Sequence, residues 1–189
     1  MDRPQIRRDF IVKLLRTIRL DPSDTFVFER AAEPGEWAVS GAFSFWSQDA
    51  GELEGKTRAA FRSGFLGVAS LGWSTLAQIV EAKTPDREGL VETLADQLVR
   101  HFGAPDLWTA RKAAEQEVVF VESLCTHPVN TLIAVRRTCE EGEIREAFRT
   151  LRPREGSRLP KVFSFVEVDG EDEAPSETVD LVGLAETRK

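Results

Sequence analysis

The chain changes character at TPDREGLVETLADQLVRHFG, residues 84–103. Thr84 suits the N-cap of a helix, Pro85 suits its first turn, and Asp86 places negative charge at the positive end of the helix dipole. The apolar residues that follow recur at helical spacing until Gly103: Leu90, Val91, Leu94, Leu98 and Phe102. The stretch therefore predicts a helix over residues 85–102 that packs one face against a core.

Upstream of this helix the pattern is that of short strands separated by turns. In the clearest of them, Trp37 to Phe45, bulky residues alternate with small ones. The expected strands span residues 13–20, 26–28, 37–45, 65–70 and 73–82, with a short helix over 54–62 that Gly64 ends. Because the connections are too short for parallel crossovers, these strands predict an antiparallel, curled sheet.

Downstream, the pattern predicts a second helix over residues 105–122 and strands over 131–138 and 161–168. The spacing of Ile144, Ala147, Phe148 and Leu151 predicts a third helix over residues 143–151. We therefore expect one α+β domain over residues 13–168, with a curved antiparallel sheet of about seven strands and two or three helices packed on one face. Residues 1–12 form a basic N-terminal extension, and residues 169–189 an acidic, flexible tail.

The charge distribution argues against binding to nucleic acid. The 189 residues carry a formal charge of −7, and 41% of them are hydrophobic. Residues 1–19 contain six basic and two acidic side chains, whereas residues 169–189 contain seven acidic and two basic ones. An acidic body repels phosphate backbones, so we expect no nucleic acid as partner. No apolar stretch is long enough for a secretory or transmembrane segment, so we expect no membrane as partner either. The chain has only two cysteines, and we expect both to be free thiols. Because free thiols are typical of a reducing compartment, a cytoplasmic location fits best.

Residues 50–57, Ala-Gly-Glu-Leu-Glu-Gly-Lys-Thr, meet a loosened phosphate-loop pattern. In this alternative, Gly55, Lys56 and Thr57 bind a nucleotide or an acyl group. The glutamates at 52 and 54 would place negative charge where phosphates must lie, and the preceding strand looks antiparallel. We therefore favour a polar loop that enters a short helix.

Cys125 and His127 stand two positions apart and could lie on one side of an extended segment, with Cys139 as a third ligand or thiol. A structural zinc site needs four ligands, however, and the other histidine, His101, ends a helix. We favour a packed cysteine and a solvated histidine, and expect neither a bound metal nor a cofactor.

Four tryptophans and twelve phenylalanines supply all the aromatic bulk, since tyrosine is absent. We expect most of them in the core. Trp46, at the end of a strand and off the face of Trp37, is expected to be exposed, where it could anchor a partner.

Residues 14–28, 35–43, 64–69 and 72–76 resemble a functionally uncharacterised, mainly alphaproteobacterial protein family, over roughly residues 13 to 168. The resemblance implies no known activity, cofactor or catalytic residue. Members of that family accompany biotin/lipoate-ligase-like proteins and redox-enzyme accessory proteins, which implies an accessory role.

No complete catalytic constellation is visible, so a non-catalytic accessory protein that binds another protein is the leading hypothesis. The alternatives are a nucleotide- or acyl-binding enzyme that uses Gly55, Lys56 and Thr57, and a thiol or metal protein that uses Cys125, His127 and Cys139.

Overall fold

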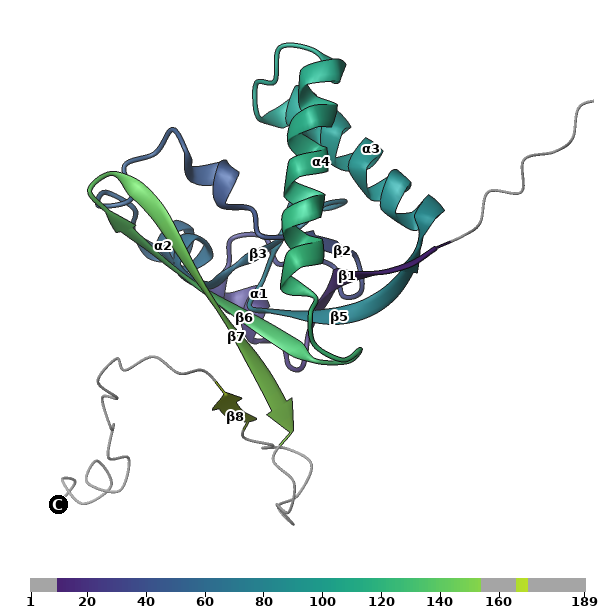
Figure 1. The fold of residues 1–189 in the computed structure, drawn as a ribbon. Helices are drawn as coiled ribbons and strands as arrows, with labels where there is room; N and C mark the ends of the chain where they lie inside the picture. Colours follow the sequence, from purple (N-terminus) through teal and green to yellow (C-terminus); the bar gives the residue numbers. More distant parts are fainter. Residues whose placement is uncertain (1–9, 154–165, 170–189) are drawn as a thin grey trace, which may run out of the picture.

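In the described part of the chain, an open antiparallel sheet of eight strands forms the body of the protein (Figure 1). The structure is a computed structural model and describes residues 10–153 and 166–169. The strands are β1 (Ile11–Ile18), β2 (Trp37–Val39), β3 (Phe65–Gly67), β4 (Trp73–Ser74), β5 (Leu76–Lys83), β6 (Leu132–Glu140), β7 (Glu143–Pro153) and β8 (Val166–Asp169). They lie in the order β4-β3-β2-β1-β5-β6-β7-β8, and every neighbouring pair is antiparallel. The predicted α+β class with a curved antiparallel sheet is confirmed.

The curvature follows from contacts between strands that are not neighbours. Four strands separate β3 from β7 in the sheet order, yet the rings of Phe65 in β3 and Phe148 in β7 have centroids 6.2 Å apart. A flat sheet would hold these strands about 24 Å apart at ordinary strand spacing. The sheet therefore curls around the side chains of its inner face.

Helices α3 (Thr84–His101) and α4 (Leu107–Leu124) lie together on one side of the sheet (Figure 1). They confirm the helices expected over 85–102 and 105–122. The main core lies between this pair and the sheet and includes Leu15, Ile79, Leu94, Val118 and Ile133. Helix α2 (Gly55–Ser63) confirms the short helix and ends at Gly64. A smaller cluster packs around it: Phe28, Phe45, Leu53, Ala60 and Phe61.

The helix predicted over residues 143–151 is wrong, because these residues belong to strand β7. Glu141 and Gly142 have φ values of 53° and 83° and form a two-residue turn, and β7 then pairs with β6 from Glu143 to Leu151. This turn geometry matches the twist of a hairpin and fixes the register. Long-range pairing with β6 overrides the helical spacing of the apolar residues.

Four of the expected strands also differ from the structure. The strand expected over 65–70 ends at Gly67, and the one expected over 73–82 is divided into β4 and β5. The strand predicted over 37–45 ends at Val39, because Gly41 adopts φ 79° and the chain continues as the 3-10 helix η1 (Ala42–Phe45). Residues 26–28 lie at the end of helix α1 (Ser23–Val27) instead of in a strand. The Asp24 carboxylate accepts a hydrogen bond from the Thr75 hydroxyl at 2.5 Å and holds this short helix against the sheet.

The terminal expectations lie mostly outside the described residues. Of the basic extension, the structure describes residues 10–12, and β1 begins within it at Ile11. Of the acidic tail it describes Asp169, the last residue of β8. Residues 161–165 of the last predicted strand also fall outside the described part. None of the described helices is both long and apolar enough to cross a bilayer.

Candidate functional site

Each helix of the α3–α4 pair is fixed at its start by a carboxylate. The side chain of Asp86 accepts the main-chain N–H of Lys83 at 2.9 Å, and that of Asp106 accepts the N–H of Thr109 at 2.7 Å. These bonds satisfy amide groups that the first turn of a helix leaves without partners. Both helices therefore begin at defined residues, and five residues connect them.

Large side chains of α3 pack against small ones of α4. The buried residues of α3 are Leu90, Val91, Leu94, Ala95 and Leu98. On α4 they are Ala110, Ala114, Val118 and Val121. Alanine at two successive turns of α4 leaves room for the leucines of α3, so the two helices pack closely along their length.

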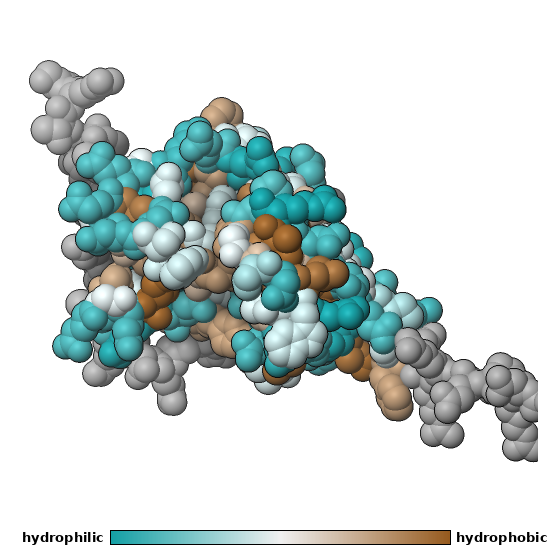
Figure 2. Space-filling view, turned by 90° about the horizontal axis from the view of Figure 1, so that it is seen from above, coloured by the Kyte–Doolittle hydropathy of each residue, from teal (hydrophilic) through white to brown (hydrophobic). Residues whose placement is uncertain are grey.

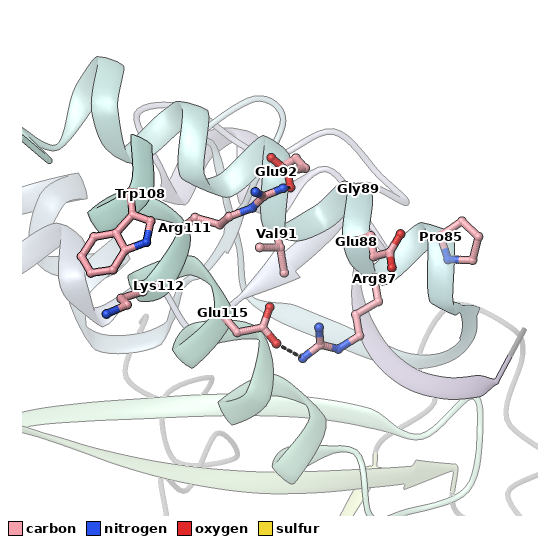
Figure 3. A pocket seen from close by; sticks show the side chains of 10 residues that line it. All are labelled: Pro85, Arg87, Glu88, Gly89, Val91, Glu92, Trp108, Arg111, Lys112 and Glu115. Carbon is pink, nitrogen blue, oxygen red and sulfur yellow. Dashed lines mark hydrogen bonds and ion pairs between the residues drawn. The ribbon is translucent and has the colours of Figure 1, made fainter. Parts of the chain in front are cut away.

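Ion pairs join the two helices on their outer side. The Arg87 guanidinium lies 2.8 Å from Glu122 through Nε. Through Nη2 it lies 2.6 Å from Glu115, and Figure 3 shows this second contact. Its pKa is raised by the hydrogen bond to Glu122 first and then by that to Glu115. Arg111 of α4 pairs with Glu92 of α3 in the same way. Charge-assisted contacts of this kind hold the helices in one relative position.

A groove of about 700 Å³ lies between these ion pairs, with Trp108 at one end and Pro85 at the other (Figure 3). Val91 lies between them, and Gly89 leaves open space because a Cβ there would meet nothing within 4 Å. Trp108 is 67% exposed, and the ammonium group of Lys112 lies 3.6 Å from the centroid of its ring. An exposed indole beside an apolar floor is a surface that suits an apolar side chain of a partner.

A second group of charged residues is buried on the inner face of the sheet, around Arg137 of β6. The Arg137 side chain is 0% exposed, and its Nε lies 2.7 Å from Glu146 Oε1 of β7. Its Nη1 donates to the carbonyls of Phe61 at 3.0 Å and Gly64 at 2.7 Å, and its Nη2 donates to the carbonyl of Ser40. The guanidinium thus satisfies carbonyl groups at the C-terminal end of α2, where the helix dipole favours a cation.

The nearby carboxyl group of Glu117 comes from α4 and accepts the main-chain N–H of Gly41 at 3.3 Å. Burial raises the pKa of Glu117, and the charge of Glu146 raises it further. Burial likewise lowers the pKa of Arg137, an effect that the attraction of Glu146 opposes. This cluster therefore connects β2, α2, α4, β6 and β7 through charge-assisted bonds.

The chemistry of the Arg137 cluster is that of a structural link. All three guanidinium nitrogens already donate to protein acceptors, and the hydroxyl of Ser40 donates to Glu146. Ser40 is 1% exposed, so its hydroxyl does not face solvent. The arrangement consequently stabilises the fold.

Gly55, Lys56 and Thr57 form the exposed first turn of α2. A phosphate loop joins a strand to a helix within a parallel βαβ unit. Here β2 is antiparallel to both of its neighbours, and η1 and a loop separate it from α2. The described residues thus do not provide the parallel unit in which a phosphate loop works.

Cys125 and Cys139 lie in different parts of the fold. Cys125 caps the end of α4 and is buried, and burial raises the pKa of its thiol to about 12. Cys139 lies near the tip of the β6–β7 hairpin and is exposed. His127 is half-buried, and its carbonyl accepts a hydrogen bond from Lys13 at 2.8 Å. Among the described residues, no three His, Cys, Asp or Glu side chains come together as a metal site.

Two of the four tryptophans are exposed. The prediction for Trp46 is confirmed, because its side chain is 75% exposed. The expectation that most other aromatic residues are core misses Trp108, which lies on the outer side of α4. Trp108 stands one helical turn before Lys112 and two turns before Glu115, so it shares a face of α4 with charged residues. This spacing is the sequence signal that could have indicated its exposure.

Arg137 and Glu146 are central to the structure, yet neither is a candidate from the sequence. The alternation of Ile133, Val135 and Arg137 in a predicted strand places the arginine on the buried face, and this signal could have found it. Glu146 could not be placed in the same way, because its segment is predicted as a helix.

The fold defines an α+β protein in which a helical hairpin covers one side of an open, curled antiparallel sheet. A family model described as "Family of unknown function (DUF6505)" matches residues 12–167, and the chain belongs to this family. The match confirms the resemblance to an uncharacterised family and nearly coincides with the region of similarity, roughly residues 13 to 168. Neither the search of curated proteins nor that of solved structures finds a match.

Proposed function

We propose that this protein is a non-catalytic accessory protein, and that a protein partner binds to the groove between α3 and α4. The observation that carries the proposal is the 67% exposure of Trp108 at the end of a groove of about 700 Å³. Tryptophan is enriched among the residues that dominate binding energy, and exposing its ring to water without a partner is unfavourable.

The charges of the groove indicate the chemistry of the partner. Arg87 and Arg111 are already paired with carboxylates of the neighbouring helix. Lys112 lies over the indole ring, and no described carboxylate lies within ion-pair distance of it. A segment that presents an apolar side chain next to an acidic one fits this arrangement, because the acid can pair with Lys112 while the apolar group contacts Trp108.

The surface around the groove favours a small, reversible contact. Figure 2 views the molecule from the side on which α3 and α4 lie, and its apolar side chains form separate patches among hydrophilic ones. Permanent interfaces are larger and more continuously apolar. The association implied by the family resemblance makes redox-enzyme and biotin/lipoate-related proteins the first partners to test.

The state of the reactive groups supports a role without catalysis. The Cys125 thiol is buried with a raised pKa, and Arg137, Glu146 and Ser40 are hydrogen-bonded to one another. A buried thiol with a raised pKa carries little of the reactive thiolate.

Affinity purification from the native cells tests the proposal, with Trp108→Ala as the variant and Trp46→Ala as the control. Trp46 is 75% exposed but does not line the groove, so both variants remove an exposed indole. We expect the wild-type chain and Trp46→Ala to recover the same partner and Trp108→Ala to lose it. Equal recovery by all three chains would overturn the proposal.

A further inference from the structure

A second groove, of about 510 Å³, lies between α2 and the outer half of β6. Strand β5 pairs with β6 only from Leu132 to Ala134, so no described strand covers the edge of β6 beyond Ala134. Helix α2 contacts β6 instead, and the groove is lined by residues of both elements. Its walls come from α2, from residues 49–51 and from residues 137–139.

The α2 wall carries two arginines without acidic partners. Arg58 and Arg62 stand one turn apart, both are exposed, and both line the groove. No carboxylate of the described residues lies within 4.0 Å of either guanidinium, whereas Arg87, Arg111 and Arg145 each pair with one. Two unpaired guanidinium groups at neighbouring turns present donors in a fork geometry that matches oxyanions.

The β6 wall adds main-chain donors. Glu140 and Glu143 flank the two-residue turn and form a hydrogen-bonded pair. From there, hydrogen-bonded and non-hydrogen-bonded residue pairs alternate along the hairpin, and Arg137 and Cys139 belong to the non-hydrogen-bonded pairs. This alternation directs the main-chain N–H groups of Arg137 and Cys139 away from β7 and toward the groove. None of the turn, loop or cap hydrogen bonds between main-chain groups of the described residues uses these two N–H groups.

The charges of the lining are mostly positive. Among the described lining residues, the one carboxylate is that of Asp49, which accepts the N–H of Gly51 at 2.9 Å and is held in that turn. Arg137 also lines the groove, but its side chain is 0% exposed and its guanidinium is paired with Glu146. An anion placed here would meet donors from both walls.

We propose that this groove binds a phosphate group, carried by a small organic molecule or free, through Arg58 and Arg62. A phosphate monoester carries close to two negative charges at neutral pH, which two unpaired guanidinium groups balance, whereas a simple carboxylate carries one. The volume is in the range of small-molecule sites and leaves room for an organic part beside Thr138 and Cys139. This site differs from the phosphate-loop alternative, since it does not use Gly55, Lys56 and Thr57.

Titration of the full chain with inorganic phosphate, AMP and acetate, followed by calorimetry and by amide NMR spectra, tests this site. We expect phosphate and AMP to bind, to shift the amide signals of Arg137 and Cys139, and to bind at least about tenfold more weakly to the Arg58→Gln/Arg62→Gln double variant. The control is Arg149→Gln, which removes an exposed arginine of the same hairpin that does not line the groove.

Tighter binding of AMP than of phosphate would assign a phosphorylated organic ligand, and equal binding would assign phosphate itself. Thermal unfolding of each variant separates a loss of the site from a loss of the fold. The proposal is overturned if neither phosphate nor AMP binds at millimolar concentration, or if acetate binds as tightly as phosphate. It is also overturned if the double variant is folded and binds phosphate and AMP with the affinity of the wild-type chain.

Discussion

Arg137 Nε of β6 and Glu146 Oε1 of β7 lie 2.7 Å apart in the interior of the curled sheet. The two residues face each other in the hairpin register, and the same arginine reaches the C-terminal end of α2. The pair thus joins the hairpin to a segment that precedes it by more than seventy residues. Its burial and its position suggest that the curvature of the sheet depends on it.

Removing the arginine tests this dependence. We expect Arg137→Met to lower the free energy of unfolding by roughly 3–5 kcal/mol, because it leaves Glu146 and the carbonyls at the end of α2 buried without their partner. Urea denaturation measures the change. The control is Arg145→Ala, which breaks the exposed pair with Glu140 on the same hairpin and should cost at most about 1 kcal/mol. Similar losses in both variants would contradict the structural role of Arg137.

The pH dependence of stability reports on Glu117. Its pKa is raised above 4.5 by burial, so between 4.5 and the raised value the folded chain binds more protons than the unfolded chain. The contribution of Glu117 to stability therefore falls as the pH rises through this window. We expect Glu117→Gln to remove this loss while keeping an acceptor for Gly41. Denaturation curves from pH 4 upward should show the stability of the variant relative to wild type rising with pH. A constant difference would argue against the raised pKa.

The two thiols should react very differently. Cys139 is exposed, whereas Cys125 is buried and its pKa is raised to about 12. We expect a thiol reagent to modify one cysteine per chain under native conditions and both after denaturation, since the thiolate is the reactive form. Cys139→Ser should abolish the native reaction. Rapid modification of Cys125 in the folded chain would show that its burial is wrong.

Gly41, just after β2, and Gly35, just before it, allow a controlled test of the close packing at the end of β2. Both have positive φ, 79° and 82°, so alanine is strained at either position by about 1 kcal/mol. A Cβ at Gly41 would also lie 2.6 Å from Cβ of Leu66, whereas a Cβ at Gly35 would meet nothing within 4 Å. We expect Gly41→Ala to lose about 1–3 kcal/mol more than Gly35→Ala in thermal or urea unfolding. Equal losses would mean that Leu66 does not pack closely against Gly41.

The helices α3 and α4 could be predicted because their signals are local. These signals are the residues that begin each helix, the apolar stripe and Gly103. Each acts on helical hydrogen bonds that lie within one or two turns of it in the sequence. Of the two exposed tryptophans that could anchor a partner, only one was predicted. Trp46 was expected at the surface, whereas Trp108 was not, because the exposure of a side chain depends on which face of α4 meets the sheet.

The sequence by itself determined the α+β class, the antiparallel pairing and the position of the helical hairpin, since propensities, caps and short connections act over a few residues. Only the tertiary structure decided that residues 143–153 form a strand, that β2 ends before Gly41, and that Arg137 is buried against α2. Each of these depends on hydrogen bonds or packing between segments far apart in the chain, whose free energy outweighs local preference.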